Sequence, residues 1–102
     1  REYDYTAATG PYEYLLGALA GCFYLTLASY GHKPWGSVDI KVRGIKRDGI
    51  PSTLETTILE ITACGVEDRD EFRALVEKAE AECSIFATVS GVSDMEVAIS
   101  FA

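Results

Sequence analysis

Residues 10–22 read Gly-Pro-Tyr-Glu-Tyr-Leu-Leu-Gly-Ala-Leu-Ala-Gly-Cys, and they give the strongest local indication of structure in the sequence. It predicts the start of a long helix, because Pro11 suits the first helical position and Glu13 suits the positive end of the helix dipole. We expect this helix from about residue 11 to residue 30. No charged residue occurs between Glu13 and His32, so apolar side chains point in nearly every direction. A helix of this kind is predicted to be buried on most sides.

Two strands are predicted after this helix. Residues 38–43 alternate apolar and charged side chains, which is typical of a half-buried strand. Residues 47–49, Arg-Asp-Gly, predict a turn, and residues 53–63 form a second strand-like run. Its apolar phase shifts in the middle, so we expect a hairpin with a bulge near Ile58.

A second helix is expected to begin near Asp68, which can cap it, with Glu71 three residues later as in a capping box. The apolar side chains that follow recur at helical spacing and would form one stripe facing the core. They are Phe72, Leu75, Val76, Ala79 and Cys83. After a break near Ser90 and Gly91, residues 95–101 alternate again and predict a last strand.

The order helix, strand, strand, helix, strand predicts an α+β fold in which an antiparallel or mixed sheet packs on the apolar helix. The chain has 102 residues, and we expect residues 1–102 to form a single domain. Three strands cannot cover an all-apolar helix alone. The remaining cover is expected from a second copy of the chain, or from residues 1–9 as an arm or extended segment.

Composition excludes several classes of protein. The chain has 16 acidic and nine basic residues, so nucleic acid and anionic membranes are not expected partners. We see no export signal and no apolar run long enough to span a membrane, which indicates a soluble, cytoplasmic protein. Three widely spaced cysteines and one histidine predict neither a disulfide framework nor a metal site, and no cofactor is expected.

Each cysteine has an ordinary structural explanation. Cys22 and Cys83 lie among apolar residues, where a free cysteine packs as a small hydrophobic side chain. Cys64 ends the second predicted strand. His32 follows the end of the first helix, where the helix dipole favours a histidine.

The sequence around two of these cysteines resembles the OsmC/Ohr family, named for osmotically inducible protein C and organic hydroperoxide resistance. Residues 10–22 are similar to the start of that family's central helix, where a proline-x-glutamate-x-leucine-leucine run leads to a reactive cysteine. Residues 79–84, Ala-Glu-Ala-Glu-Cys-Ser, resemble the end of its second helix, with Ser84 where many relatives have proline. The order of elements agrees as well. The strands that the family places before this helix are not expected in residues 1–9, so the chain is either a natural short form or part of a longer protein.

The resemblance implies an intertwined homodimer that reduces organic hydroperoxides. It implies that Cys22 is the peroxidatic thiolate, that Cys83 is the resolving thiol, and that an external thiol or lipoyl reductant restores the pair. Glu13 is implied as a site residue, nine positions before Cys22 as in the wider OsmC-like group. The helix dipole explains Glu13 equally well.

A reactive thiol in an apolar helix needs a cation or hydrogen-bond donors that favour the thiolate. In the peroxidase branch of the family an arginine before the helix supplies the charge, whereas here only Arg1 precedes Gly10, and Arg43 and Arg47 are the other candidates. The missing arginine favours an alternative, a non-enzymatic dimeric OsmC-like module for small-molecule binding or interaction. A thiol sensor or disulfide exchanger is the third hypothesis.

Aromatic side chains could line an apolar pocket for an alkyl peroxide, or they could pack at an interface. They are Tyr3, Tyr5, Tyr12, Tyr14, Phe23, Tyr24 and Trp35.

Overall fold

The computed structural model describes residues 10–102. The expected arm of residues 1–9, with Arg1, Tyr3 and Tyr5, lies outside these residues. The described elements are α1 (Pro11–Ala28), β1 (Ser37–Lys46), β2 (Leu54–Cys64), α2 (Arg69–Glu82), α3 (Ser84–Ser90) and β3 (Asp94–Phe101).

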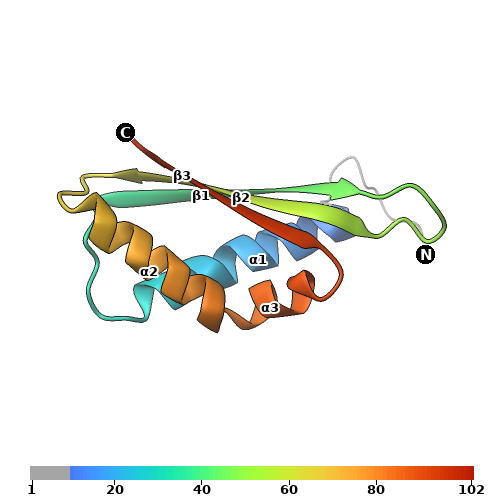
Figure 1. The fold of residues 1–102 in the computed structure, drawn as a ribbon, viewed down its shortest axis with the longest axis horizontal. Helices are drawn as coiled ribbons and strands as arrows, with labels where there is room; N and C mark the ends of the chain where they lie inside the picture. Colours follow the sequence, from blue (N-terminus) through green and yellow to red (C-terminus); the bar gives the residue numbers. More distant parts are fainter. Residues whose placement is uncertain (1–9) are drawn as a thin grey trace.

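The strands form one sheet in the order β1-β2-β3. β1 and β2 are antiparallel, whereas β2 and β3 are parallel, so the sheet is mixed. Figure 1 shows the sheet as one layer, with the three helices together on one of its faces. This arrangement confirms the predicted α+β class and its mixed sheet.

Helix α1 begins at Pro11, with Gly10 as its N-cap. Among the residues that the structure describes, the fully buried side chains of α1 lie on one side of it and are Leu19, Phe23 and Leu27. Tyr14 and Leu25 on other sides are 63% and 69% exposed. Residues 10–102 of one chain therefore leave part of this apolar helix uncovered, as the limited width of the predicted sheet implies.

The hairpin differs from the prediction in the position of its irregularity. Ile45 pairs with Thr56 and Lys46 with Leu54, so Glu55 is the extra residue, and the predicted bulge near Ile58 is wrong. This bulge accounts for the shift in apolar phase, because it lets Leu54 and Thr57, three positions apart, both lie on the inner face. Thr57 is fully buried, and its hydroxyl lies 2.7 Å from that of Ser93, so a polar residue takes an inward position once its hydrogen bond is satisfied.

The segment after Asp68 contains two helices and not the single one predicted. Asp68 caps α2 as expected, because its Oδ1 accepts a hydrogen bond from the amide of Glu71 at 3.0 Å. The chain then bends at Cys83, which has an extended backbone (φ −74°, ψ 115°), ends α2 and caps α3. Cys83 still faces the core, because it is 1% exposed.

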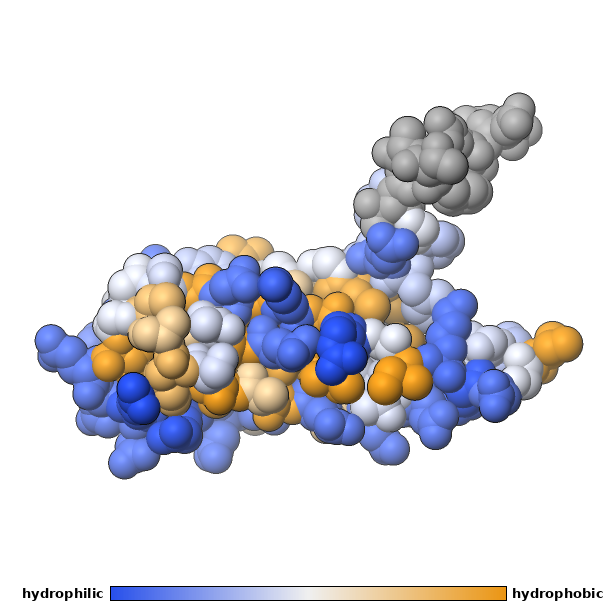
Figure 2. Space-filling view, turned by 90° about the horizontal axis from the view of Figure 1, so that it is seen from above, coloured by the Kyte–Doolittle hydropathy of each residue, from blue (hydrophilic) through white to orange (hydrophobic). Residues whose placement is uncertain are grey.

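The outer face of the sheet, opposite the helices, is largely polar. Figure 2 looks onto the molecule from the sheet side and shows hydrophilic side chains over much of the surface, with apolar side chains between them. Arg43 on β1 donates to Glu60 on β2 at 2.8 Å, and both are exposed at this face. None of the helices within residues 10–102 is long and apolar enough to cross a membrane.

Candidate thiol site

Cys22 and Cys83 come together beneath the sheet, although they are 61 positions apart in sequence. The Sγ atom of Cys83 donates to that of Cys22 at 3.4 Å, and both thiols are free. Cys22 projects from the middle of α1, and Cys83 lies at the junction of α2 and α3. Helices α2 and α3 both pack against α1, so their junction lies against the turn of α1 that contains Cys22.

The pKa of the Cys22 thiol is lowered from its ordinary value. The largest cause is a hydrogen bond from the backbone amide of Ile85, in the first turn of α3, and the Cys83 thiol and the Ser84 hydroxyl add to it. Desolvation opposes these donors but does not outweigh them. The Thr26 hydroxyl has one proton, which the Cys22 carbonyl accepts at 2.8 Å, so we give it a minor part.

Cys83 has the opposite behaviour. Burial raises the pKa of its thiol above the ordinary value, and the neighbouring Cys22 adds to the effect, while the amide of Phe86 opposes it. A protonated Cys83 can donate to a Cys22 thiolate, which matches the direction of the hydrogen bond between them. The geometry therefore favours one nucleophilic thiolate beside one protonated thiol.

The two hairpin arginines considered as activating cations are engaged elsewhere. Arg43 pairs with Glu60, and Arg47 donates to the Thr53 hydroxyl and to the carbonyl of Val92 at 3.1 Å. No cation of residues 10–102 is among the causes of the lowered Cys22 pKa. Within the described chain, backbone and side-chain donors favour the thiolate in place of an arginine.

Glu13 is not brought to the thiol pair. It is exposed in the first turn of α1. Nine residues of α-helix separate it from Cys22, which is about two and a half turns, so the two side chains leave α1 on opposite sides. Glu13 could reach a thiol site only in a second copy of the chain.

An apolar cavity of about 260 Å³ lies on the N-terminal side of the thiol pair, and neither Cys22 nor Cys83 is among its lining residues. It lies between the first turns of α1, the start of β2 and the end of α3. Leu15 lines it and precedes Cys22 by seven residues, about two helical turns, so both side chains are on the same side of α1. The lining residues are Tyr12, Leu15, Thr53, Leu54, Thr88, Val89 and Val92.

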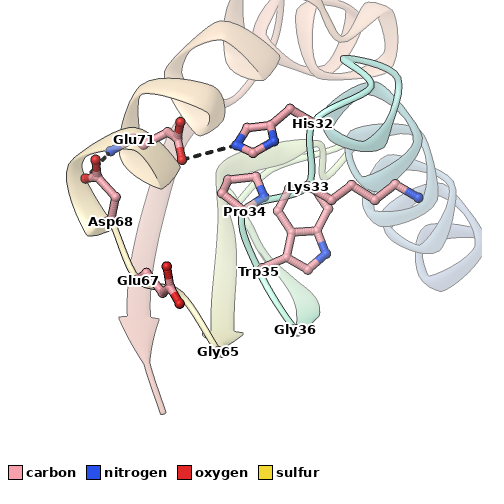
Figure 3. Close-up of a pocket in the computed structure, with 9 residues that line it drawn as sticks. All are labelled: His32, Lys33, Pro34, Trp35, Gly36, Gly65, Glu67, Asp68 and Glu71. Carbon is pink, nitrogen blue, oxygen red and sulfur yellow. Dashed lines mark hydrogen bonds and ion pairs between the residues drawn. The ribbon is translucent and has the colours of Figure 1, made fainter.

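A second cavity, of about 330 Å³, is polar and contains no cysteine (Figure 3). It lies between the α1–β1 and β2–α2 connections, where His32 faces Glu71 at 3.3 Å. Trp35 forms part of its wall and packs edge-on against Phe72. Its lining residues are His32, Lys33, Pro34, Trp35, Gly36, Gly65, Glu67, Asp68 and Glu71. We separate it from the thiol site, because it lies beyond the C-terminal end of α1 and its lining is polar and charged.

Cys64 ends β2, half-buried, and its carbonyl accepts a hydrogen bond from the amide of Gly36 at 2.7 Å. Among residues 10–102 no group of three histidine, cysteine or carboxylate side chains could hold a metal ion.

Sequence reasoning missed the donors around Cys22. Ile85 acts through its backbone amide, which is independent of residue type, so no sequence signal marks it. The only available signal was Ser84, a residue type common at helix starts, directly after Cys83. A helix start at that point would have indicated free amides beside the second thiol.

Residues 4–98 match the family model described as OsmC-like protein. No curated protein matches the chain significantly. An OsmC-like protein from Mycoplasma pneumoniae superimposes with a TM-score of 0.82 at 18% identity, over 98% of this chain and 78% of that one.

Two further solved structures share the fold. The organic hydroperoxide resistance protein OhrB of Bacillus subtilis has a TM-score of 0.72 at 16% identity, with 94% of this chain and 76% of that one covered. An organic hydroperoxide resistance protein OsmC from Legionella pneumophila has a TM-score of 0.71 at 20% identity, with 91% and 70% covered. Because the family model spans nearly all of the sequence, the chain belongs to the OsmC-like protein family.

Proposed function

We propose that this protein is a thiol peroxidase that reduces organic hydroperoxides through Cys22 and Cys83. The single observation behind the proposal is the 3.4 Å contact between their Sγ atoms. The lowered pKa of Cys22 and the raised pKa of Cys83 support a division into a nucleophilic thiolate and a resolving thiol. A cytoplasmic setting, where thiols are kept reduced, is part of this proposal.

The chemistry uses two thiols for each peroxide. The Cys22 thiolate attacks the distal peroxide oxygen, an S–O bond forms, the O–O bond breaks, and the alkoxide takes a proton to leave as an alcohol. Cys83 loses its proton and attacks the Cys22 sulfenic acid, so the S–S bond forms and the S–O bond breaks. The departing hydroxide takes a proton and leaves as water. An external thiol or a lipoyl dithiol then reduces the disulfide.

The apolar cavity supports an organic substrate. It lies on the Cys22 side of α1, roughly 10 Å along the helix axis from the thiol, and it is lined mainly by apolar side chains. An alkyl or aryl group could occupy it while the peroxide group reaches Cys22. Hydrogen peroxide, which has no such group, would gain nothing from this cavity.

A homodimer is part of the proposal. Tyr14, Ala18, Gly21 and Leu25, which we call the α1 stripe, are exposed and follow one side of α1 next to Cys22. A Cβ atom added at Gly21 would meet nothing within 4 Å among residues 10–102, although glycine disfavours a helix by roughly 1 kcal/mol relative to alanine. Packing of a second copy on the α1 stripe would explain this glycine and shield the thiols.

The dimer is tested by sedimentation of the wild type and of Leu25→Arg and Gly21→Ala at micromolar concentration. We expect a wild-type dimer and a Leu25→Arg monomer, because a buried unpaired charge opposes association. Gly21→Ala tests whether Gly21 serves close packing between two copies. It should weaken a tightly packed dimer, whereas in a monomer it should stabilise the helix by about 1 kcal/mol. A wild-type monomer would refute the dimer.

The peroxidase proposal is tested by titrating the reduced protein with cumene hydroperoxide and counting free thiols. We expect two thiols to be lost per peroxide in the wild type. Cys22→Ser should abolish this loss, whereas Cys83→Ser should retain the first step and accumulate a sulfenic acid that dimedone traps. Cys64→Ser is the matched control, and its stoichiometry should equal that of the wild type.

A second candidate function is a non-enzymatic, dimeric OsmC-like module that binds a small molecule or a partner. The observation that favours it is that no described cation lies against the Cys22 sulfur. If the wild type keeps all its thiols over hours with excess cumene hydroperoxide, the peroxidase proposal is wrong and this candidate replaces it.

A further inference from the structure

Tyr30 connects the end of α1 to the last turn of α2. It follows Ser29, the C-cap of α1, and its hydroxyl donates to Glu82 Oε1 at 2.8 Å, across 52 positions of sequence. The ammonium group of Lys78, one turn before Glu82, lies 4.4 Å from the centroid of the Tyr30 ring. We call these three residues the Tyr30 clasp.

The Tyr30 clasp is attached directly to the second thiol. Glu82 is the last residue of α2, and Cys83 follows it. The Cys83 amide donates to the carbonyl of Ala79 at 2.8 Å, and the Cys83 carbonyl accepts from the amide of Ala87 at 3.0 Å. The backbone of Cys83 is therefore held by α2 and α3, and its sulfur moves with the turn that Tyr30 holds.

Disulfide formation makes the position of this turn important. The Sγ atoms are 3.4 Å apart, whereas a disulfide has a length near 2.05 Å, so the sulfurs must approach by roughly 1.3 Å. Cys22 precedes the last residue of α1, Ala28, by six residues or about 9 Å along the helix axis, and Tyr30 follows two residues later. The clasp and the thiol pair are thus two connections between α1 and the turn that ends in Cys83.

The clasp persists over the pH range in which thiols react. Burial, together with the hydrogen bond and the charge of Glu82, raises the pKa of Tyr30 to about 12. The phenol consequently retains the proton that it donates to Glu82 while Cys22 becomes a thiolate. The Lys78 ammonium group lies over the face of the Tyr30 ring, where it does not compete for that proton.

We propose that Tyr30 and Glu82 are positioning residues that hold Cys83 within reach of Cys22, so that the clasp accelerates disulfide closure without affecting the attack on peroxide. The inference rests on the proposed function for its biological meaning. The step concerned is the attack of Cys83 on the Cys22 sulfenic acid, in which S–S forms, S–O breaks and water leaves.

The test compares Tyr30→Phe, Glu82→Ala and Glu82→Gln with the wild type in single-turnover reactions with cumene hydroperoxide. Tyr30→Phe keeps the ring beside Lys78 and removes only the hydroxyl. Tyr24→Phe, which removes a hydroxyl from a tyrosine on α1, is the matched control. Sulfenic acid formation should keep its wild-type rate. Disulfide formation should slow roughly threefold to tenfold in Tyr30→Phe and in Glu82→Ala. Glu82→Gln retains an acceptor oxygen and should restore most of the rate.

Two further readouts follow from a longer-lived sulfenic acid. Tyr30→Phe should form sulfinic acid at a lower peroxide concentration than the wild type, as detected by mass spectrometry. The double variant Tyr30→Phe/Glu82→Ala should close its disulfide no more slowly than either single variant, because both remove one hydrogen bond.

A measurement without peroxide separates this inference from the proposed function. In glutathione buffers of defined composition, the equilibrium between the Cys22–Cys83 disulfide and the two thiols reports their effective concentration. Tyr30→Phe and Glu82→Ala should lower it roughly threefold to tenfold, and Glu82→Gln should restore it. If the wild type is inert to peroxide but the variants show this shift in the glutathione equilibrium, the peroxidase proposal is wrong and the positioning role of the clasp stands.

Two outcomes would overturn the inference. One is an unchanged glutathione equilibrium and closure rate in Tyr30→Phe and Glu82→Ala. The other is an equal fall of sulfenic acid formation and disulfide closure in parallel with thermal stability, which would make the clasp a structural contact only.

Discussion

Cys22 and Cys83 touch, yet their surroundings differ. Cys22 belongs to the middle of a regular helix and is half-buried, and the Ile85 amide makes the largest contribution to lowering its pKa. Cys83 is buried at a break between two helices, where desolvation has the largest influence on its thiol. Position on a helix alone therefore does not set the pKa of a thiol. Free backbone donors at the start of α3 favour a thiolate on the neighbouring helix, while the residue at the break stays protonated.

The largest expected effect is selective alkylation of the reduced protein. At pH 7 iodoacetamide should modify Cys22 on the order of tenfold faster than Cys83, because the pKa of Cys22 is lowered and that of Cys83 is raised. Mass spectrometry can follow each thiol, since the three cysteines fall in separate tryptic peptides. As pH rises, the Cys22 rate should level off first. Equal rates at all pH values would contradict the contrast.

A smaller effect on the alkylation of Cys22 is expected when Cys83 is replaced. Cys83→Ala deletes a donor to the Cys22 sulfur, so the pKa of Cys22 should move upward. Alkylation of Cys22 at pH 7 should slow roughly twofold to tenfold. Cys64→Ala is the control and should leave the Cys22 profile unchanged. A faster Cys22 in Cys83→Ala would mean that access, and not hydrogen bonding, limits the reaction.

The smallest effect separates stability from thiol chemistry. Asp68→Ala removes the side chain that caps α2 and should lower the free energy of unfolding by about 1 kcal/mol. Cys83 lies at the other end of α2, so the ratio of Cys22 to Cys83 alkylation should not change. Urea unfolding and alkylation at pH 7 measure the two quantities. A changed ratio would indicate that the thiol contrast depends on the stability of the whole helix.

Much of the fold could be predicted from local patterns. Pro11 begins α1, Asp68 caps α2, and period-two alternation marks β1 and β3, because each signal depends on neighbours within a few residues. Two predictions failed where a distant partner decides the outcome. The bulge lies at Glu55 and turns Thr57 inward, where its hydroxyl pairs with that of Ser93, and the break at Cys83 interrupts an apolar stripe that continues past it.

The candidate site was predictable only in part. Family resemblance selected Cys22, Cys83 and Glu13, but nothing local indicated that Ile85 would offer its amide or that Tyr30 would reach Glu82. The structure brings the two thiols together and leaves Glu13 on the far side of α1. Their catalytic roles stay predictions until thiols are counted against peroxide.

By itself, the sequence determined the helices and strands, the uncharged length of α1 and the membership in the OsmC-like family, because these depend on side-chain order along the chain. Tertiary structure decided the pairing of Cys22 with Cys83, the direction of their pKa shifts and the Tyr30 clasp. The reason is physical. A thiol responds to the donors and the burial around its sulfur, and here the most influential donor comes from a residue 63 positions away, brought near only when α3 packs on α1.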